Sequence, residues 1–308
     1  MGMSAARLAV PLTLAALAAL PSQQQQPVFR ARSDAVTIQV SVKSGNRPIG
    51  GLTAADFALR DNGVAQAVAS VSAEQVPVDL TVLLDLSASV DGRLLDRLKA
   101  AVRDTAVLLH ADDRIRLVAV THVLQEAFDL RRAGPMPLDT LAAAGATSLY
   151  DGLAAAMMRP SEPGRRQLVV AFTDGRDSTS ILDESAVKEI ARLTDVVVNI
   201  VVPTPVITDP TVRGNSTFAW MATQPWARRE PFFAVLTDLV EPSTGQVLVL
   251  EGDQSISRAF KKLLDDFRTT YILEYLPQGV AALGWHDVVV TVTRPGAYDI
   301  RARRGYQG

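Results

Sequence analysis

The stretch that decides the fold lies at residues 80–89 and reads LTVLLDLSAS. Its first five residues are almost all apolar, which is typical of a central parallel strand covered by helices on both faces. Asp85, Ser87 and Ser89 then alternate with apolar residues, so in an extended turn their oxygen atoms can converge on one point. Mg²⁺ prefers oxygen ligands of this kind in octahedral geometry. The stretch therefore predicts a buried strand that opens into a loop of cation ligands.

Two further segments repeat this arrangement of apolar and oxygen-bearing residues. The apolar run at 168–172 stops at Thr173 and Asp174, and a glycine-flanked loop at 145–152 carries Thr147 before an Ala- and Met-rich helix. Strand and helix patterns alternate over residues 78–269, which favours an α/β fold with a doubly wound, mostly parallel sheet and helices on both faces. Because ligands bind at the carboxyl ends of strands in such sheets, Asp85 and Asp174 are expected at the binding edge.

The segments on either side of this region are predicted to be β structure. Residues 35–76 and 270–306 contain short alternating apolar runs separated by turn residues. Since the termini of a domain often lie close together, we expect the two segments to form one small β module. Within the α/β region we expect a short helix at 137–143 and a long loop or insertion at 203–231.

Composition and missing motifs exclude several functions. The chain of 308 residues has no Cys, which rules out disulfides and thiolate zinc sites, and its net charge of -2 argues against nucleic acid as a partner. It lacks the Gly-x-x-x-x-Gly-Lys phosphate loop and the Gly-x-Ser-x-Gly nucleophile motif, so no nucleotide and no serine-hydrolase site is expected. His110, His122 and His286 are scattered along the chain.

The N-terminal residues have the pattern of a signal peptide. Residues 1–22 combine a basic start, an apolar stretch and a small-residue run, followed by a polar segment. We therefore expect a periplasmic or secreted protein, attached to a membrane only if this segment stays uncleaved.

The order Asp85-x-Ser87-x-Ser89, Thr147 and Asp174 resembles the metal-ion-dependent adhesion site of the von Willebrand factor type A domain. A narrower likeness covers nearly the whole mature chain. The segments GLTAADF at 51–57, YILEY at 271–275 and RARRGY at 301–306 are similar to those of VWFA-related proteins of the acidobacterial type.

The resemblance implies a cation site made of these five residues, each a ligand directly or through water. It implies Mg²⁺, with Mn²⁺ and Ca²⁺ as alternatives, and an open position that accepts an Asp or Glu carboxylate of a partner protein. The expected function is adhesion or protein–protein interaction rather than catalysis. Two alternatives stay open: a metal-assisted hydrolase, and a structural envelope scaffold whose metal stabilises the loops. Taken singly, each of the five residues is also an ordinary turn or helix-capping residue.

Overall fold

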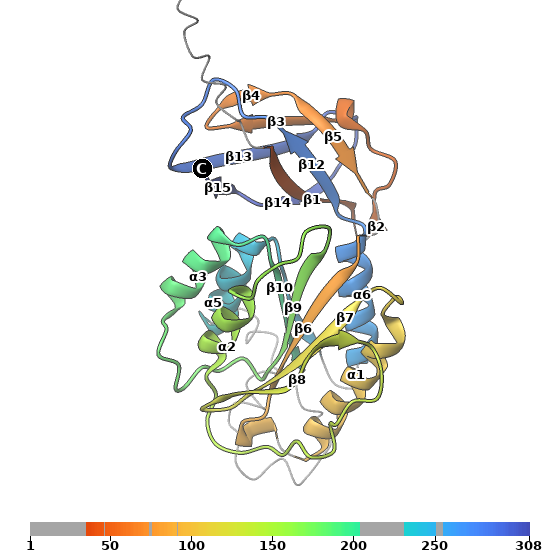
Figure 1. The fold of residues 1–308 in the computed structure, drawn as a ribbon, viewed down its shortest axis with the longest axis vertical. Coiled ribbons are helices and arrows are strands. Elements are labelled where there is room, and N and C mark those ends of the chain that lie inside the picture. Colours follow the sequence, from red (N-terminus) through yellow and green to blue (C-terminus); the bar gives the residue numbers. More distant parts are fainter. Residues whose placement is uncertain (1–34, 46, 74–75, 91, 204–230, 251–254) are drawn as a thin grey trace, which may run out of the picture. The chain divides into compact units, whose positions relative to one another are not determined.

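The computed structural model describes residues 35–308 except 46, 74–75, 91, 204–230 and 251–254 (Figure 1). The predicted signal peptide and nearly all of the predicted 203–231 insertion lie outside the described residues. Within the described part, no helix is both long enough and apolar enough to cross a membrane.

The central element is a six-stranded mixed sheet with the strand order β11-β10-β9-β6-β7-β8. Neighbouring strands run parallel except for the edge strand β8, which is antiparallel to β7. The strands are β6 (Val78–Asp85), β7 (Arg114–Val120), β8 (Leu124–Arg132), β9 (Arg166–Phe172), β10 (Val197–Pro203) and β11 (Val247–Leu250). The apolar run at residues 80–84 thus belongs to an inner strand of an α/β sheet, as predicted.

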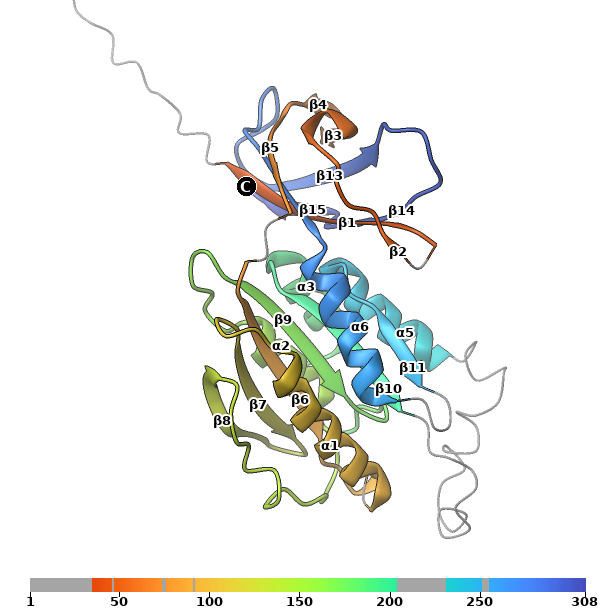
Figure 2. The same cartoon turned by 90° about the vertical axis from the view of Figure 1, so that its right-hand side faces the viewer.

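Helices cover this sheet on both faces (Figure 2). One face packs against α1 (Arg93–Leu108) and α6 (Ile256–Arg268), and the other against α2 (Leu149–Met157), α3 (Glu184–Leu193) and α5 (Pro231–Val240). The two cores explain the continuous apolar run of β6, because Val82 and Leu84 join one core while Leu83 joins the other. Every residue of β6 is buried.

Strands from the two terminal segments pair with one another. The strand β1 (Val36–Ser44) is antiparallel to β12 (Tyr271–Tyr275) and β14 (Asp299–Ala302), and β12 also pairs with β5 (Val68–Ser72). A second sheet has the order β15-β13-β3-β4, with β13 (Trp285–Val292) between β15 (Gly305–Gln307) and β3 (Phe57–Asp61), and with β4 (Val64–Gln66) at its edge. The two-residue strand β2 (Arg47–Pro48) pairs antiparallel with the end of β1. We call these strands the β module.

The short helix expected at 137–143 is absent from the structure, so that prediction was wrong. The segment instead buries Leu138 and Leu141 in the core beside α1 without forming a helix. Lys99 of α1 donates a hydrogen bond of 2.6 Å from its Nζ to the carbonyl oxygen of Leu141. A segment of this length gains too few internal hydrogen bonds to offset helix nucleation, and the contacts with α1 decide its conformation.

Candidate functional site

Three loops meet at the carboxyl end of β6. The loop after β6 joins the 144–148 loop through a hydrogen bond of 3.0 Å from Ala88 N to Gly145 O. The 144–148 loop is in turn joined to the end of β7 by a bond of 2.8 Å from Ser148 N to Thr121 O. Because β6 lies between β7 and β9, the loop after β9 comes to the same edge. The predicted site residues come from these loops.

The structure brings the five predicted ligands together. The hydroxyl oxygens of Ser87 and Ser89 are 2.9 Å apart, and Thr147 Oγ1 lies 3.5 Å from Asp85 Oδ1. Asp174 is close enough for its charge to raise the pKa of Asp85. Asp85, Ser87 and Thr147 are buried, while Ser89 is exposed and Asp174 is half-buried. The cluster is therefore open to solvent on the side of Ser89 and Asp174.

Asp85 is a buried carboxylate with neutral partners. Its Oδ2 accepts a hydrogen bond of 2.7 Å from Thr173 Oγ1, and its Oδ1 accepts one of 2.8 Å from Ser87 N. Burial raises the pKa of Asp85 most strongly, these hydrogen bonds lower it, and the charge of Asp174 raises it again, so that the pKa lies above its usual value. The ionised form is thus destabilised in the protein without a cation.

One distance in the cluster is compatible with a small, hard cation. Oxygen ligands on adjacent vertices of an octahedron with 2.0 to 2.1 Å bonds are about 2.9 Å apart. The hydroxyl oxygens of Ser87 and Ser89, which are hydrogen-bonded to each other, have this separation of 2.9 Å. Among the described residues no group of three or more His, Cys, Asp or Glu side chains has the arrangement of a metal site. A cation at this edge would therefore depend on the hydroxyl groups as well as on the two carboxylates.

Two nearby carboxylates hold the loop after β9 in place. Asp151 accepts hydrogen bonds of 2.9 Å from the backbone N–H groups of Ile181 and Leu182. Asp177 accepts from Tyr150 N at 3.2 Å and from Ser180 Oγ at 2.5 Å. Both side chains fix the loop against the start of α2. Asp91, a third acidic residue near the loops in sequence, lies outside the described residues.

Thr173 was missed by sequence reasoning although its hydroxyl contacts Asp85 directly. It is buried, donates to Asp85 and accepts a hydrogen bond of 2.8 Å from Gly175 N. The available signal was its position, since Thr173 directly follows β9, the strand next to β6, and directly precedes Asp174.

His122 lies at the rim of the same loops. It is exposed and follows the end of β7 by two residues, and its ring packs against Gly145. The sequence analysis did not place His122 at this site, because the three histidines are scattered in sequence. The placement could have been predicted from the strands, since β6 and β7 are parallel neighbours that end at the same edge, and His122 follows β7.

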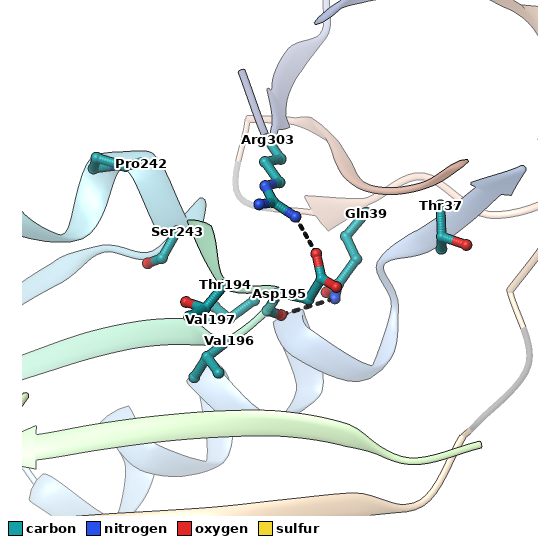
Figure 3. Close-up of a pocket in the computed structure, with 9 residues that line it drawn as sticks. All are labelled: Thr37, Gln39, Thr194, Asp195, Val196, Val197, Pro242, Ser243 and Arg303. Carbon is teal, nitrogen blue, oxygen red and sulfur yellow. Dashed lines mark hydrogen bonds and ion pairs between the residues drawn. The ribbon is translucent and has the colours of Figure 1, made fainter. Parts of the chain in front are cut away.

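A small pocket lies away from this edge and is lined by both the β module and the start of β10 (Figure 3). Gln39 Nε2 donates to the carbonyl oxygen of Asp195 at 3.2 Å, and Arg303 forms an ion pair with the Asp195 side chain. Asp195 precedes β10, so the pocket is at the amino ends of the parallel strands. It is therefore separate from the predicted ligands, which follow the carboxyl ends.

Neither a protein-family model nor a curated protein matches the sequence. Solved structures are similar to the chain at low identity. The protein BatB from Bacteroides thetaiotaomicron is 14% identical, covering 62% of this chain and 98% of its own, with a TM-score of 0.46. A von Willebrand factor type A protein from Catenulispora acidiphila is 11% identical, covering 91% and 76%, with a TM-score of 0.47.

The PilB minor pilin from Streptococcus sanguinis is 13% identical, covering 64% of this chain and 63% of its own, with a TM-score of 0.46. These neighbours include the domain type that the sequence resembles. Their TM-scores lie below 0.5. The α/β fold of this chain is defined by its strand order and register, and the narrower acidobacterial likeness stays a prediction.

Proposed function

We propose that this chain is an exported, divalent-cation-dependent module that binds a carboxylate of a partner protein and has no catalytic activity of its own. The observation that carries the proposal is Asp85, a buried carboxylate beside Asp174 with neutral hydrogen-bond partners. Buried charges in proteins are normally paired or bound to a metal. A divalent cation would balance these two carboxylates.

The ligand set also favours an anionic partner. Ser87, Ser89 and Thr147 would contribute neutral oxygen atoms, so a divalent cation held here would keep its affinity for a further anionic oxygen. The exposed side of the cluster, at Ser89 and Asp174, is where that oxygen could approach. An Asp or Glu side chain of a partner supplies such a group. Mg²⁺ is the proposed cation, with Mn²⁺ and Ca²⁺ as alternatives.

The test is metal binding by isosteric variants. Calorimetry with Mg²⁺, and electron paramagnetic resonance with Mn²⁺, should detect one site in the wild type and none in Asp85→Asn or Asp174→Asn. Asp112→Asn is the matched control, because Asp112 is an exposed carboxylate whose ion pair with Arg132 is 3.9 Å long. Equal metal affinity in wild type and Asp85→Asn would contradict the proposal.

Export is part of the proposal and rests on residues 1–22. Expression of the full sequence should place the protein in the periplasm or medium, and deletion of these residues should retain it in the cytoplasm. Equal distribution of both forms would contradict export while leaving the metal site untouched.

A metal-assisted hydrolase is the second candidate, and the position of His122 at the rim favours it. An exposed imidazole near a cation can act as a general base toward metal-bound water. A screen with generic ester and phosphoester substrates in the presence of Mg²⁺ or Mn²⁺ tests it, with Asp85→Asn as the control. Turnover that disappears in Asp85→Asn would support the hydrolase over the binding module.

The structural scaffold makes a different prediction. A metal that only stabilises the loops should raise the melting temperature without any effect on capture of an envelope protein. Pull-downs with Mg²⁺, with EDTA and with Asp85→Asn distinguish the two, because the binding module requires the metal for capture.

A further inference from the structure

We propose that His122 is a second contact for the partner's carboxylate, donating a hydrogen bond to the carboxylate oxygen that does not bind the cation. This inference rests on the proposed function and assigns a recognition residue to the same site. His122 is not one of the five predicted ligands. In this proposal it contacts the partner's carboxylate and does not bind the metal.

The backbone places His122 at the apex of a tight turn. Thr121 N donates to Val123 O at 3.0 Å, and Val123 N donates to Thr121 Oγ1 at 3.2 Å. The turn directly follows β7, whose residue Val120 pairs with Asp85 of β6. The chain therefore presents the imidazole one strand away from the buried carboxylate.

The His122 ring lies against Gly145, on the side of the site. A Cβ atom at Gly145 would lie 2.8 Å from His122 Nδ1 and 3.5 Å from Cε1, so the ring occupies the space that any other side chain would need. Gly145 also has a positive φ of +72°, which favours glycine for a second reason. Its carbonyl oxygen accepts from Ala88 N, between the two serines. The ring thus packs against the 144–148 loop, which contains Thr147 and is hydrogen-bonded to Ala88 between the two serines.

The ring has the hydrogen-bonding capacity that the role requires. Among the described residues no hydrogen bond or ion pair engages the His122 side chain, and the residue is exposed. An imidazole carries at least one N–H group in both its neutral and its protonated form, so donation needs no particular charge state. The Nδ1 edge faces Gly145, which leaves the Nε2 edge on the side away from it.

Other hydroxyl groups at the rim already have partners within the loops. Ser178 Oγ is 3.0 Å from Thr147 N, and Thr179 Oγ1 is 2.9 Å from Ser148 Oγ. A carboxylate has two oxygen atoms, and an oxygen that loses water at an interface needs a new donor. Unlike these two hydroxyl groups, the His122 side chain has no hydrogen-bond partner among the described residues, so it can donate to the second oxygen.

The experiment uses Mn²⁺ as the metal and N-acetyl-aspartate N-methylamide as the carboxylate probe. Paramagnetic broadening of the probe's proton resonances reports its binding to the Mn²⁺-loaded full chain. We expect His122→Ala to weaken probe binding about 10-fold. Electron paramagnetic resonance should show unchanged Mn²⁺ affinity, and His122→Gln, which keeps an N–H donor, should recover part of the loss.

The control is His110→Ala. His110 is also exposed, but it lies before β7, at the opposite end of the strand, where its backbone N–H bonds to Asp113. His110→Ala should bind the probe like the wild type.

The outcomes separate the two proposals. Equal probe affinity in wild type and His122→Ala, with Mn²⁺ bound in both, overturns the role of His122 and leaves the metal site standing. A wild-type protein that binds Mn²⁺ but not the probe overturns carboxylate recognition by His122 and by the metal together. Failure of the wild type to bind Mn²⁺ overturns the proposed function itself.

Discussion

The strand β6 carries an aspartate at each end, and the two carboxylates have different partners. Asp79, at the amino end, binds Arg114 through bonds of 2.9 and 2.6 Å and Arg165 through a bond of 2.7 Å. Asp85, at the carboxyl end, binds Thr173 and a backbone N–H group. Both residues are buried, with 4% and 1% exposure.

The two aspartates have pKa values shifted in opposite directions. Burial raises the pKa of Asp79, but the hydrogen bonds and charges of the two arginines outweigh it, and the pKa lies below its usual value. The pKa of Asp85 is raised. The fold therefore neutralises one end of the strand with its own side chains, whereas the described residues give the carboxylate at the other end no cationic partner. Under the proposed function, a bound cation would supply the compensating charge at the Asp85 end.

The largest expected effect is the loss of Asp79. Asp79→Ala removes the carboxylate shared by two partly buried guanidinium groups, of which Arg114 keeps only its pair with the exposed Glu162. The variant should lower the free energy of unfolding by about 3 kcal/mol. Urea denaturation in EDTA measures it. Asp112→Asn, which removes an exposed carboxylate, should stay within about 0.5 kcal/mol of the wild type. Similar values for both variants would contradict the contrast between the two ends.

The response to Mg²⁺ should be confined to the Asp85 end. At a free Mg²⁺ concentration 100 times the dissociation constant, the wild type should gain about 2.7 kcal/mol of stability. Asp85→Asn should gain none, and in EDTA it should be at least as stable as the wild type, because it no longer buries an unbalanced carboxylate. Thermal unfolding with and without Mg²⁺ measures both. An equal gain in the variant would place the metal elsewhere.

Thr173 should tune the metal without binding it. Thr173→Val keeps the shape of the side chain but removes the hydrogen bond to Asp85, and should weaken Mg²⁺ binding about 10-fold or more. Thr179→Val is the control, because the Thr179 hydroxyl bonds to Ser148 instead. Calorimetry compares them, and unchanged affinity in Thr173→Val would show that this bond does not orient the ligand.

The smallest effect is the acid sensitivity of the Asp79 end. A lowered pKa means that the ion pairs stabilise the fold above the unfolded-state value of about 3.9 and lose that contribution as the pH falls through the folded-state pKa. Between pH 7 and pH 3.5 the wild type should lose at most about 0.7 kcal/mol relative to Asp79→Asn. Urea denaturation should show that the stability difference between the wild type and Asp79→Asn shrinks as the pH falls from 7 to 3.5. A difference that grows would contradict the lowered pKa of Asp79.

Much of the site could be predicted because it depends on strand ends. Parallel strands in one sheet bring their carboxyl ends to a single edge, so Asp85 and Asp174 could be grouped without knowing any side-chain contact. Thr147 precedes α2 rather than following a parallel strand, and only the family resemblance grouped it with them. The apolar run of β6 likewise determines that the strand lies between two layers of helices, since both faces must be covered.

The remaining contacts depend on pairing between distant segments. The partners of Asp79 lie 35 and 86 residues away, and no local pattern marks which arginine would reach it. The prediction of a helix at residues 137–143 was wrong for a related reason. The burial of Leu138 against α1 outweighs the weak local preference for a helix. The scattered positions of the histidines in the sequence likewise gave no reason to place His122 at the rim, where the order of the strands brings it.

The pairing of β1 with β12 and β14 has a consequence for synthesis. All six strands of the α/β sheet lie within residues 78–250, whereas β1, apart from its short pairing with β2, finds its partners among residues 271–302. While the ribosome is still making the middle of the chain, Ile38 and Val40 belong to an unpaired, apolar strand, which is prone to aggregation. The β module can therefore assemble only after the α/β sheet has been made, and β1 depends until then on whatever holds the nascent chain.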